Sequence, residues 1–285
     1  MQARALTLRA ALISLLLLAS LLLGWQVATL PTTRAGGAMS AEQIEYAKLM
    51  GGSTGPIKRS GFPTPMQLGQ TIVAQLAHPF FDNGPNDKGI GIQLAFSLGR
   101  VGLGFLIAAV VAIPAGFVLG MSPLLQRAFN PFIQILKPIS PLAWMPLALY
   151  TIKDSSISGI FVIFICSVWP MLMNTAFGVA AVRRDWLNVA RTLEVGRLRT
   201  AFLVILPAAA PTILTGMRIS MGIAWLVIVA AEMLVGGTGI GYFVWNEWNN
   251  LSLSSVIFAI LLIGATGMLL DLFFARLQKL VTYVE

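Results

Sequence analysis

Charged residues are scarce in this chain. Asp, Glu, Lys and Arg make up only 11% of its 285 residues, whereas hydrophobic residues make up 57%. A soluble globular domain has roughly 25% charged residues. The composition therefore excludes an ordinary soluble enzyme and indicates that long apolar segments lie in a membrane. The net charge of +8 then reflects basic loops beside that membrane rather than a nucleic-acid interface.

Residues that build disulfides, metal centres and nucleotide sites are also almost absent. The chain has one cysteine, Cys166, and one histidine, His78, so neither a disulfide framework nor a zinc site is expected. The glycine-rich stretch 51–55 is not followed by the Gly-Lys-Ser/Thr triplet of a P-loop, and 237–241 lacks the third glycine of a dinucleotide motif. Any dependence on ATP must therefore come from a partner.

Long apolar runs dominate what the sequence does contain. A helix needs ~20 apolar residues to cross a bilayer core of about 30 Å. We predict a transmembrane helix for each of six runs: residues 8–30, 92–120, 129–150, 158–182, 206–235 and 252–272. The first run follows Arg4 and Arg9 as a secretory signal would, but its apolar part exceeds the ~7–15 residues typical of one. An uncleaved helix is therefore favoured.

Basic residues in the short loops predict the orientation of these helices. The loop at 183–199 carries five arginines, whereas the loop at 236–251 has no Lys or Arg. Basic loops stay in the cytoplasm, which places both termini there. Residues 31–91, rich in Gly and Pro, then form a long external segment, since long loops largely escape the charge rule.

The third run contains four prolines, Pro131, Pro138, Pro141 and Pro146. Each proline lacks a backbone N–H and clashes with the preceding turn. Within lipid such a helix needs neighbours or water to satisfy the freed carbonyls, and broken helices of this kind often line transport cavities. A kinked helix packed on protein is the alternative.

Four charged residues fall within or near the predicted spans: Arg100, Lys137, Arg218 and Glu232. Charges inside a membrane are costly and usually functional, and three of the four are basic, which suits an anionic solute. The alternative is that Arg100 extends to the outer interface and that Lys137 and Arg218 extend to the inner one. We favour a structural role for Arg100 and retain Lys137, Arg218 and Glu232 as candidate pathway residues.

A short amphipathic segment stands out in the basic loop at 183–207. Its apolar residues Leu187, Ala190 and Leu193 recur at helical spacing. A helix at the membrane surface can lay such a face into a groove on a partner. We expect this face to be buried in the partner, with Ala190 at the closest approach; the alternative is a charged loop without a partner.

The same loop resembles the cytoplasmic coupling loop of the permeases of ATP-binding-cassette (ABC) importers. That family's pattern is Glu-Ala-Ala, three residues, Gly, nine residues, then an aliphatic residue, any residue and Leu-Pro. Here Asn188-Val189-Ala190 stands at the first position, Glu194 at the glycine, and 204–207 at the end. The residues assigned to the coupling loop by this resemblance are Leu187, Asn188, Val189, Ala190, Leu193, Glu194, Gly196, Leu206 and Pro207.

The resemblance covers nearly the whole chain, and the nearest members are the nitrate, taurine, alkanesulfonate and bicarbonate permeases. Residues 81–91 resemble the nitrate and bicarbonate branch in particular. The resemblance implies an all-α polytopic membrane protein with about six transmembrane helices and the type I importer (MetI-like) fold. It implies an N-terminal transmembrane helix at 1–30, a periplasmic segment at 31–91, and a permease domain at 92–285 with its coupling loop at 183–207.

The implied machine lies in a bacterial inner membrane. It has a second permease copy, two cytoplasmic ATPases that hold ATP and Mg²⁺, and a periplasmic solute-binding protein. The permease itself would have no catalytic residue and bind no metal or cofactor. Nitrate, with nitrite or cyanate, is the first expected solute and bicarbonate the second; a sulfonate or taurine is a further alternative.

Two other classes are weighed against this one. An ion-gradient-driven carrier is usually larger and built from internal repeats, and no clear repeat is visible here. An intramembrane enzyme would need paired His or carboxylate motifs, which the apolar runs lack.

Overall fold

A computed structural model describes residues 2–29, 62–84 and 87–281, and nearly all of these residues are helical. Within these ranges the only β-type pairing is an isolated bridge between Asp82 and Lys88. Five of the described helices are long and apolar enough to cross a membrane, and a bent pair of shorter helices makes a sixth if it counts as one span. The fold is thus all-α, as predicted. Much of the expected external segment lies outside the described residues.

The chain divides into two compact units, which are residues 1–74 with 252–258 and residues 75–251 with 259–285. In the first unit, α1 (Gln2–Thr29) precedes the beginning of α3 (Pro65–Ala77). The Trp25 indole donates a hydrogen bond to the Pro63 carbonyl over 3.0 Å, and its ring meets Phe62 edge-on. The end of α1 is therefore tied to the chain just before α3.

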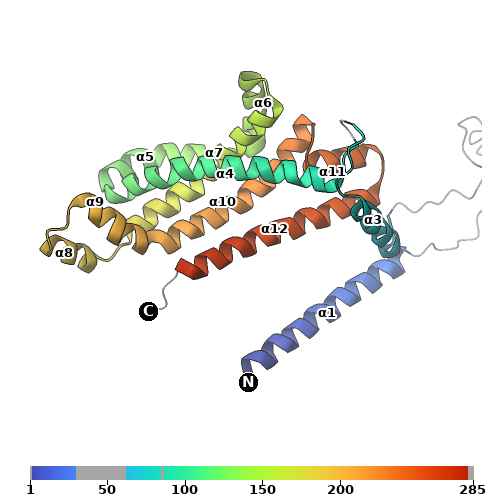
Figure 1. The fold of residues 1–285 in the computed structure, drawn as a ribbon, viewed down its shortest axis with the longest axis horizontal. Coiled ribbons are helices and arrows are strands. Elements are labelled where there is room, and N and C mark those ends of the chain that lie inside the picture. The colour runs from blue at the N-terminus through green and yellow to red at the C-terminus, as the bar shows by residue number, and fades with distance from the viewer. Residues whose placement is uncertain (1, 30–61, 85–86, 282–285) are drawn as a thin grey trace, which may run out of the picture. The chain divides into compact units, whose positions relative to one another are not determined.

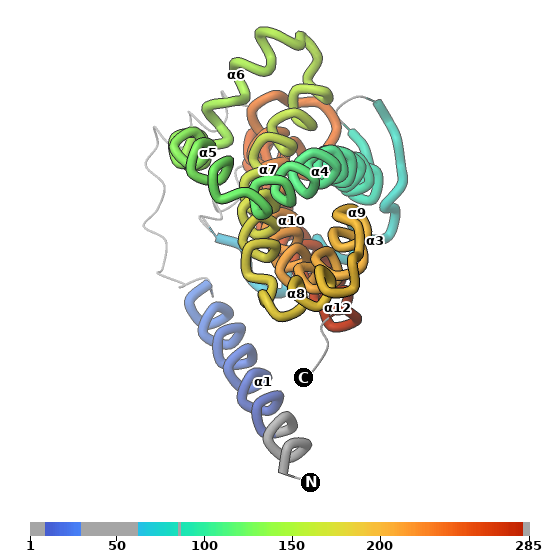
Figure 2. The backbone as a smooth tube through the Cα atoms, turned by 90° about the vertical axis from the view of Figure 1, so that its left-hand side faces the viewer, coloured from blue at the N-terminus to red at the C-terminus, as the bar shows by residue number. Residues whose placement is uncertain are grey.

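Three long helices form the centre of the second unit, namely α4 (Ile90–Met121), α7 (Ser155–Ala180) and α10 (Leu206–Val235). They run side by side (Figures 1 and 2). Small residues allow α4 and α7 to approach closely, because a Cβ at Gly116 would lie 2.6 Å from the Leu172 carbonyl oxygen. Such close approach suits helices in lipid, where packing rather than water drives association.

The third apolar run is broken into two helices, as its prolines indicated, and the two form one bent span if they are counted together. It forms α5 (Pro123–Leu136) and α6 (Pro141–Ile152), which are bent by 89°. Pro141 lies in the first turn of α6, where its missing N–H costs nothing. Pro138 lies in the break, and a proline there disfavours continuation of the preceding helix. Figure 1 shows α6 projecting away from the direction of α5.

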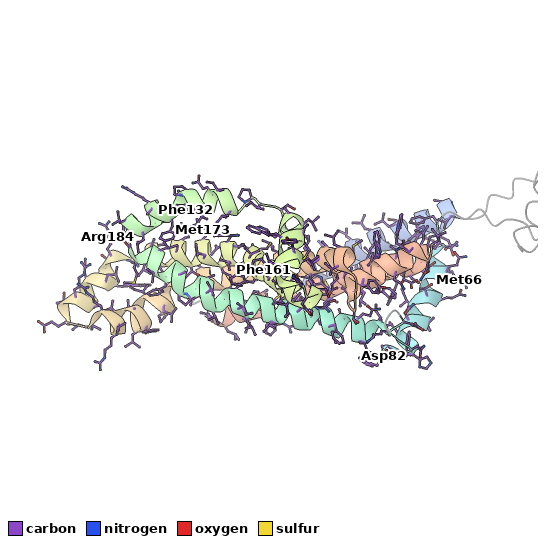
Figure 3. All side chains as sticks on the ribbon, turned by 90° about the horizontal axis from the view of Figure 1, so that it is seen from above. Met66, Asp82, Phe132, Phe161, Met173 and Arg184 are labelled. Atoms are coloured by element: carbon purple, nitrogen blue, oxygen red, sulfur yellow. The ribbon has the colours of Figure 1, made fainter. Side chains whose placement is uncertain are left out.

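The remaining elements of the second unit lie at the two ends of the three central helices. At one end are α8 (Arg184–Thr192), α9 (Arg197–Thr200) and the π-helical turn η1 (Ala201–Ile205), which leads into α10. At the other are α11 (Ile240–Asn249) and the tight loop before α4 that contains Asp82 (Figure 3). The last helix, α12 (Leu253–Val281), belongs to this unit from Ala259 onward.

Candidate functional site

A buried ion pair joins α4 to the last turn of α10. Arg100 Nη1 lies 2.8 Å from Glu232 Oε1, and the two side chains are 13% and 4% exposed. The Arg100 guanidinium also donates to the Ser156 hydroxyl over 2.9 Å and to the Thr238 carbonyl over 2.6 Å. Arg100 therefore does not extend to the outer interface, because its charge is held inside the fold.

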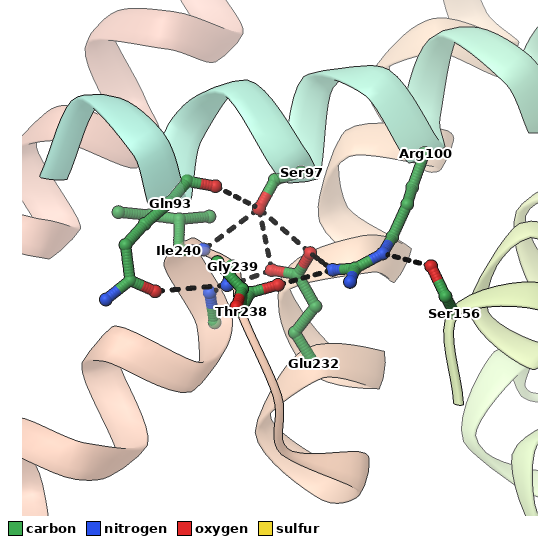
Figure 4. Close-up of polar contacts among 9 residues, drawn as sticks. Gln93, Ser97, Arg100, Ser156, Glu232, Thr238, Gly239 and Ile240 are labelled. Carbon is green, nitrogen blue, oxygen red and sulfur yellow. Dashed lines mark hydrogen bonds and ion pairs between the residues drawn. The ribbon is translucent and has the colours of Figure 1, made fainter. Parts of the chain in front are cut away.

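The Glu232 carboxylate also organises the beginning of α11. It accepts hydrogen bonds from the Ser97 hydroxyl over 2.8 Å and from the Gly241 N–H over 3.0 Å. The Ile240 N–H donates to Ser97 Oγ, and the Gly239 N–H donates to Gln93 Oε1 (Figure 4). Side chains of α4 and α10 thus satisfy the first N–H groups of α11, which have no partners within their own helix.

Glycines let the loop after α10 approach this carboxylate. A Cβ at Gly239 would lie 2.2 Å from the Glu232 carboxyl carbon, and one at Gly241 would lie 2.1 Å from the Val229 carbonyl oxygen. Real Cβ atoms do not come so close, so only glycine fits at either position. Packing against the end of α10 therefore explains Gly239 and Gly241, whereas Gly237 adopts a left-handed φ of 96° that favours glycine.

The Glu232 carboxylate is only 4% exposed and fully engaged in this network. A small cavity of about 10 Å³ lies beside it, lined by Arg100, Ser155 and Glu232 among others, and that volume corresponds to roughly one water molecule. The predicted pathway role of Glu232 stays a prediction. We assign Glu232 and Arg100 to the positioning of α11.

Arg218, a second candidate pathway residue, has a partner that the sequence reasoning missed. Its guanidinium donates through Nε to Asp271 Oδ1 over 2.5 Å and through Nη2 to Asp271 Oδ2 over 2.6 Å. The two side chains remain 37% and 52% exposed. Asp271 is the single charged residue of the sixth apolar run, and that isolation was the signal that could have identified it.

Lys137, the third candidate, is placed differently from the other two. It ends α5 at the break before α6 and is exposed. Among the described residues it forms no ion pair. Of the three predicted pathway residues, Glu232 is therefore buried in a hydrogen-bonded network, Arg218 forms an exposed ion pair, and Lys137 is an exposed cation.

The predicted coupling segment forms a helix, but its faces differ from the expectation. Leu187 packs against a buried cluster of this same chain formed by Val179, Ile205, Ala209 and Ile213, with Leu206 beside it. Ala190 is buried as well, whereas Leu193 is 69% exposed. Ala190 is covered by its own chain and Leu187 is partly covered by it, so this face is not fully available to a partner. Their predicted burial in a partner stays a prediction. The exposed apolar residues of α8 and its C-cap are Trp186, Val189 and Leu193.

The end of α8 explains the glycine of the family pattern. The Val195 N–H donates to the Ala190 carbonyl and the Glu194 N–H donates to the Arg191 carbonyl, which is the Schellman arrangement at a helix C-terminus. Glu194 adopts φ 53°, a left-handed conformation that favours glycine. Of the other predicted residues, Asn188 and Pro207 are exposed, and Gly196 precedes α9.

A family profile matches most of the chain. The family described as binding-protein-dependent transport system inner membrane component matches residues 104–283. Among solved structures, the chain resembles an inward-facing methionine ABC transporter, MetNI, with a TM-score of 0.60 at 15% identity over 67% of this chain and 95% of that one. This likeness supports the type I importer fold.

Three curated relatives extend the comparison. The nitrate import permease protein NrtB of Synechocystis is 45% identical over 79% of this chain and 82% of its own. The bicarbonate transport system permease protein CmpB of the same organism is 44% identical over 72% and 74%. The taurine transport system permease protein TauC of Escherichia coli is 32% identical over 77% and 78%. The chain therefore belongs to the family of binding-protein-dependent transport system inner membrane components, as a permease subunit of an ABC importer.

Proposed function

We propose that this permease carries nitrate, or a related small anion such as nitrite or cyanate, across the inner membrane. The observation that carries the proposal is the likeness to nitrate permeases at 42–45% identity over most of both chains. The exposed Lys137 at the break between α5 and α6 supports it. An unpaired cation in a low-dielectric pathway attracts an anion and raises its local concentration.

Bicarbonate is the second candidate, because the bicarbonate permeases are 44–45% identical to this chain. The nitrate relatives align over 73–79% of the chain and the bicarbonate relatives over 72%, at similar identity. The uptake experiment below therefore decides between the two anions. A sulfonate is less favoured, since the taurine permease is only 32% identical.

The proposal includes the rest of the machine. Two cytoplasmic ATPases hold ATP and Mg²⁺, while this chain holds neither, and an external binding protein delivers the anion to two copies of the permease. The ATPase docks on the outward residues of α8, Trp186, Val189 and Leu193, because a partly exposed apolar face on a short surface helix fits a groove on a partner. Both termini lie in the cytoplasm, on the side of the basic loops.

Uptake by the reconstituted importer tests the solute. The permease, its ATPase and its binding protein are placed in proteoliposomes, and accumulation of labelled nitrate, bicarbonate and taurine is measured with and without ATP. Nitrate should accumulate only with ATP and in preference to the other two. Accumulation of bicarbonate alone would establish the second candidate, and accumulation of taurine alone would overturn the proposal.

A further inference from the structure

The membrane spans contain two arginine–carboxylate pairs, and the two are built differently. The Arg100–Glu232 pair is almost sealed and has additional partners in Ser97 and Ser156. The Arg218–Asp271 pair is 37% and 52% exposed. For these two residues the structure shows hydrogen bonds only to each other, within the part of the chain it describes. The first pair is buried in a hydrogen-bonded network. The second pair is exposed, so another anion can reach the guanidinium and replace the carboxylate.

The open pair lies inside its helices, away from their ends. Arg218 is 12 residues beyond the start of α10 at Leu206, or about 18 Å along a helix. Asp271 is 10 residues before the end of α12 at Val281, or about 15 Å. Charged groups that are open at such depth face a water-filled path or protein rather than lipid. The exposed side of this pair is therefore a candidate surface of the anion pathway.

The geometry of the pair shows what else the guanidinium can bind. Its Nε and Nη2 atoms donate to the two Asp271 oxygens over 2.5 and 2.6 Å, a two-pronged arrangement that matches a planar carboxylate. Nitrate and bicarbonate are also planar and present two oxygens along one edge, as a carboxylate does. Tetrahedral oxyanions such as phosphate also bind a guanidinium through two oxygens. Asp271 thus occupies the position that an oxyanion would take.

We propose that Arg218 is the anion-binding residue of the pathway and that Asp271 holds its guanidinium until a small oxyanion displaces it. This inference rests on the proposed function. A guanidinium without a partner at this depth is unfavourable, so Asp271 neutralises it between transport events. When the anion arrives, the half-exposed Asp271 side chain turns into the water of the pathway and Arg218 keeps one negative partner.

The pair is not required merely to fasten α12 to α10. The Gln278 amide donates to Thr215 Oγ1 over 2.9 Å, and the Trp225 indole donates to the Ile263 carbonyl over 3.0 Å. These two contacts join the same helices on either side of Arg218. Exchange of Asp271 for an anion would therefore leave these two contacts in place.

Direct anion binding tests the inference. Labelled nitrate is equilibrated by dialysis with the purified permease–ATPase complex, without the binding protein, for wild type and three variants. Asp271→Asn frees the guanidinium and should bind nitrate about tenfold more tightly than wild type. Arg218→Gln combined with Asp271→Asn leaves no unpaired charge and should lose nitrate binding. Arg218→Lys keeps the charge without the two-pronged geometry and should bind at least tenfold more weakly.

Thr215→Val is the matched control, since it breaks a contact between the same two helices and leaves Arg218 and Asp271 unchanged. It should bind and transport nitrate as wild type does. Wild-type nitrate binding in the Arg218→Gln, Asp271→Asn double variant, or in Arg218→Lys, would overturn the inference while leaving nitrate import intact. A wild-type importer that accumulates neither nitrate nor bicarbonate would instead overturn the proposed function.

Discussion

Arg100 Nη1 lies 2.8 Å from Glu232 Oε1, and this ion pair joins α4 to α10 across 132 positions of sequence. The same carboxylate accepts the Gly241 N–H at the start of α11. One buried acid therefore connects two membrane-spanning helices to the helix that follows the second of them. The pair therefore contributes to the position of α11.

Breaking the pair on one side should be costly. Glu232→Ala leaves the Arg100 guanidinium buried without its counter-ion, and losing one partner of a buried pair costs about 3–5 kcal/mol. The thermal midpoint of the detergent-purified permease should fall accordingly. The Arg100→Met, Glu232→Met double variant leaves no buried charge and should recover part of the loss, while the Gly241 N–H and the Ser97 hydroxyl still lack their acceptor. A double variant no more stable than Glu232→Ala would contradict this reading.

A second prediction concerns the C-terminus of α8. Glu194 has φ 53°, and the left-handed conformation costs a non-glycine residue roughly 1–2 kcal/mol. Glu194→Gly should remove that strain and stabilise the end of α8 by about 1 kcal/mol after the entropic cost of glycine. This stabilisation should appear as slower hydrogen exchange of the backbone amides of Glu194 and Val195, whose N–H groups form the cap.

Glu194→Ala is the control for the side chain. It removes the carboxylate but keeps the strained backbone, so exchange of the Val195 amide should stay close to wild type. If Ala and Gly slow exchange equally, the carboxylate rather than the backbone conformation limits this helix end.

Lys137 offers a test of anion attraction. Lys137→Ala should reduce nitrate uptake at subsaturating concentration about tenfold, since a unit charge acting over ~10 Å at an effective dielectric near 20 contributes roughly 1–2 kcal/mol. Lys137→Arg should retain most of the uptake. Lys153→Ala is the matched control, because Lys153 is also exposed but caps the far end of α6. Equal losses in both alanine variants would exclude a specific role for Lys137.

The broad architecture followed from the sequence because lipid imposes simple length and polarity rules on helices. Prolines in the third run also located the break between α5 and α6. The 89° bend itself did not follow, because it depends on which neighbours hold the two halves. The spacing of apolar residues predicts which face of each helix is buried, but it does not predict the angle between consecutive helices.

Pairing between distant residues was the least predictable feature. Arg218 and Asp271 are 53 positions apart, and Ser97 lies 135 positions from Glu232. Charged residues on separate helices pair only when those helices pack together, and the sequence alone does not show which helices do so. The sequence likewise did not show that Ala190 and part of Leu187 pack on their own chain, since an amphipathic face can cover its own chain as readily as a partner.

The most direct test of the account asks whether the outward face of α8 holds the ATPase. The change is Leu193→Asp or Val189→Asp, each of which places a charge on an exposed apolar position. Burying a Leu or Val side chain in a partner contributes roughly 1.5–3 kcal/mol, and the new carboxylate must also be desolvated. Leu187→Asp is the contrasting variant, because it should destabilise the permease itself.

The measurement is the amount of ATPase that co-purifies with each tagged permease, alongside its membrane insertion. Leu193→Asp and Val189→Asp should insert normally and retain at least tenfold less ATPase, with uptake falling in parallel. Leu187→Asp should instead reduce the amount of folded permease. If both outward variants hold the ATPase and transport like wild type, α8 does not couple this permease to ATP hydrolysis.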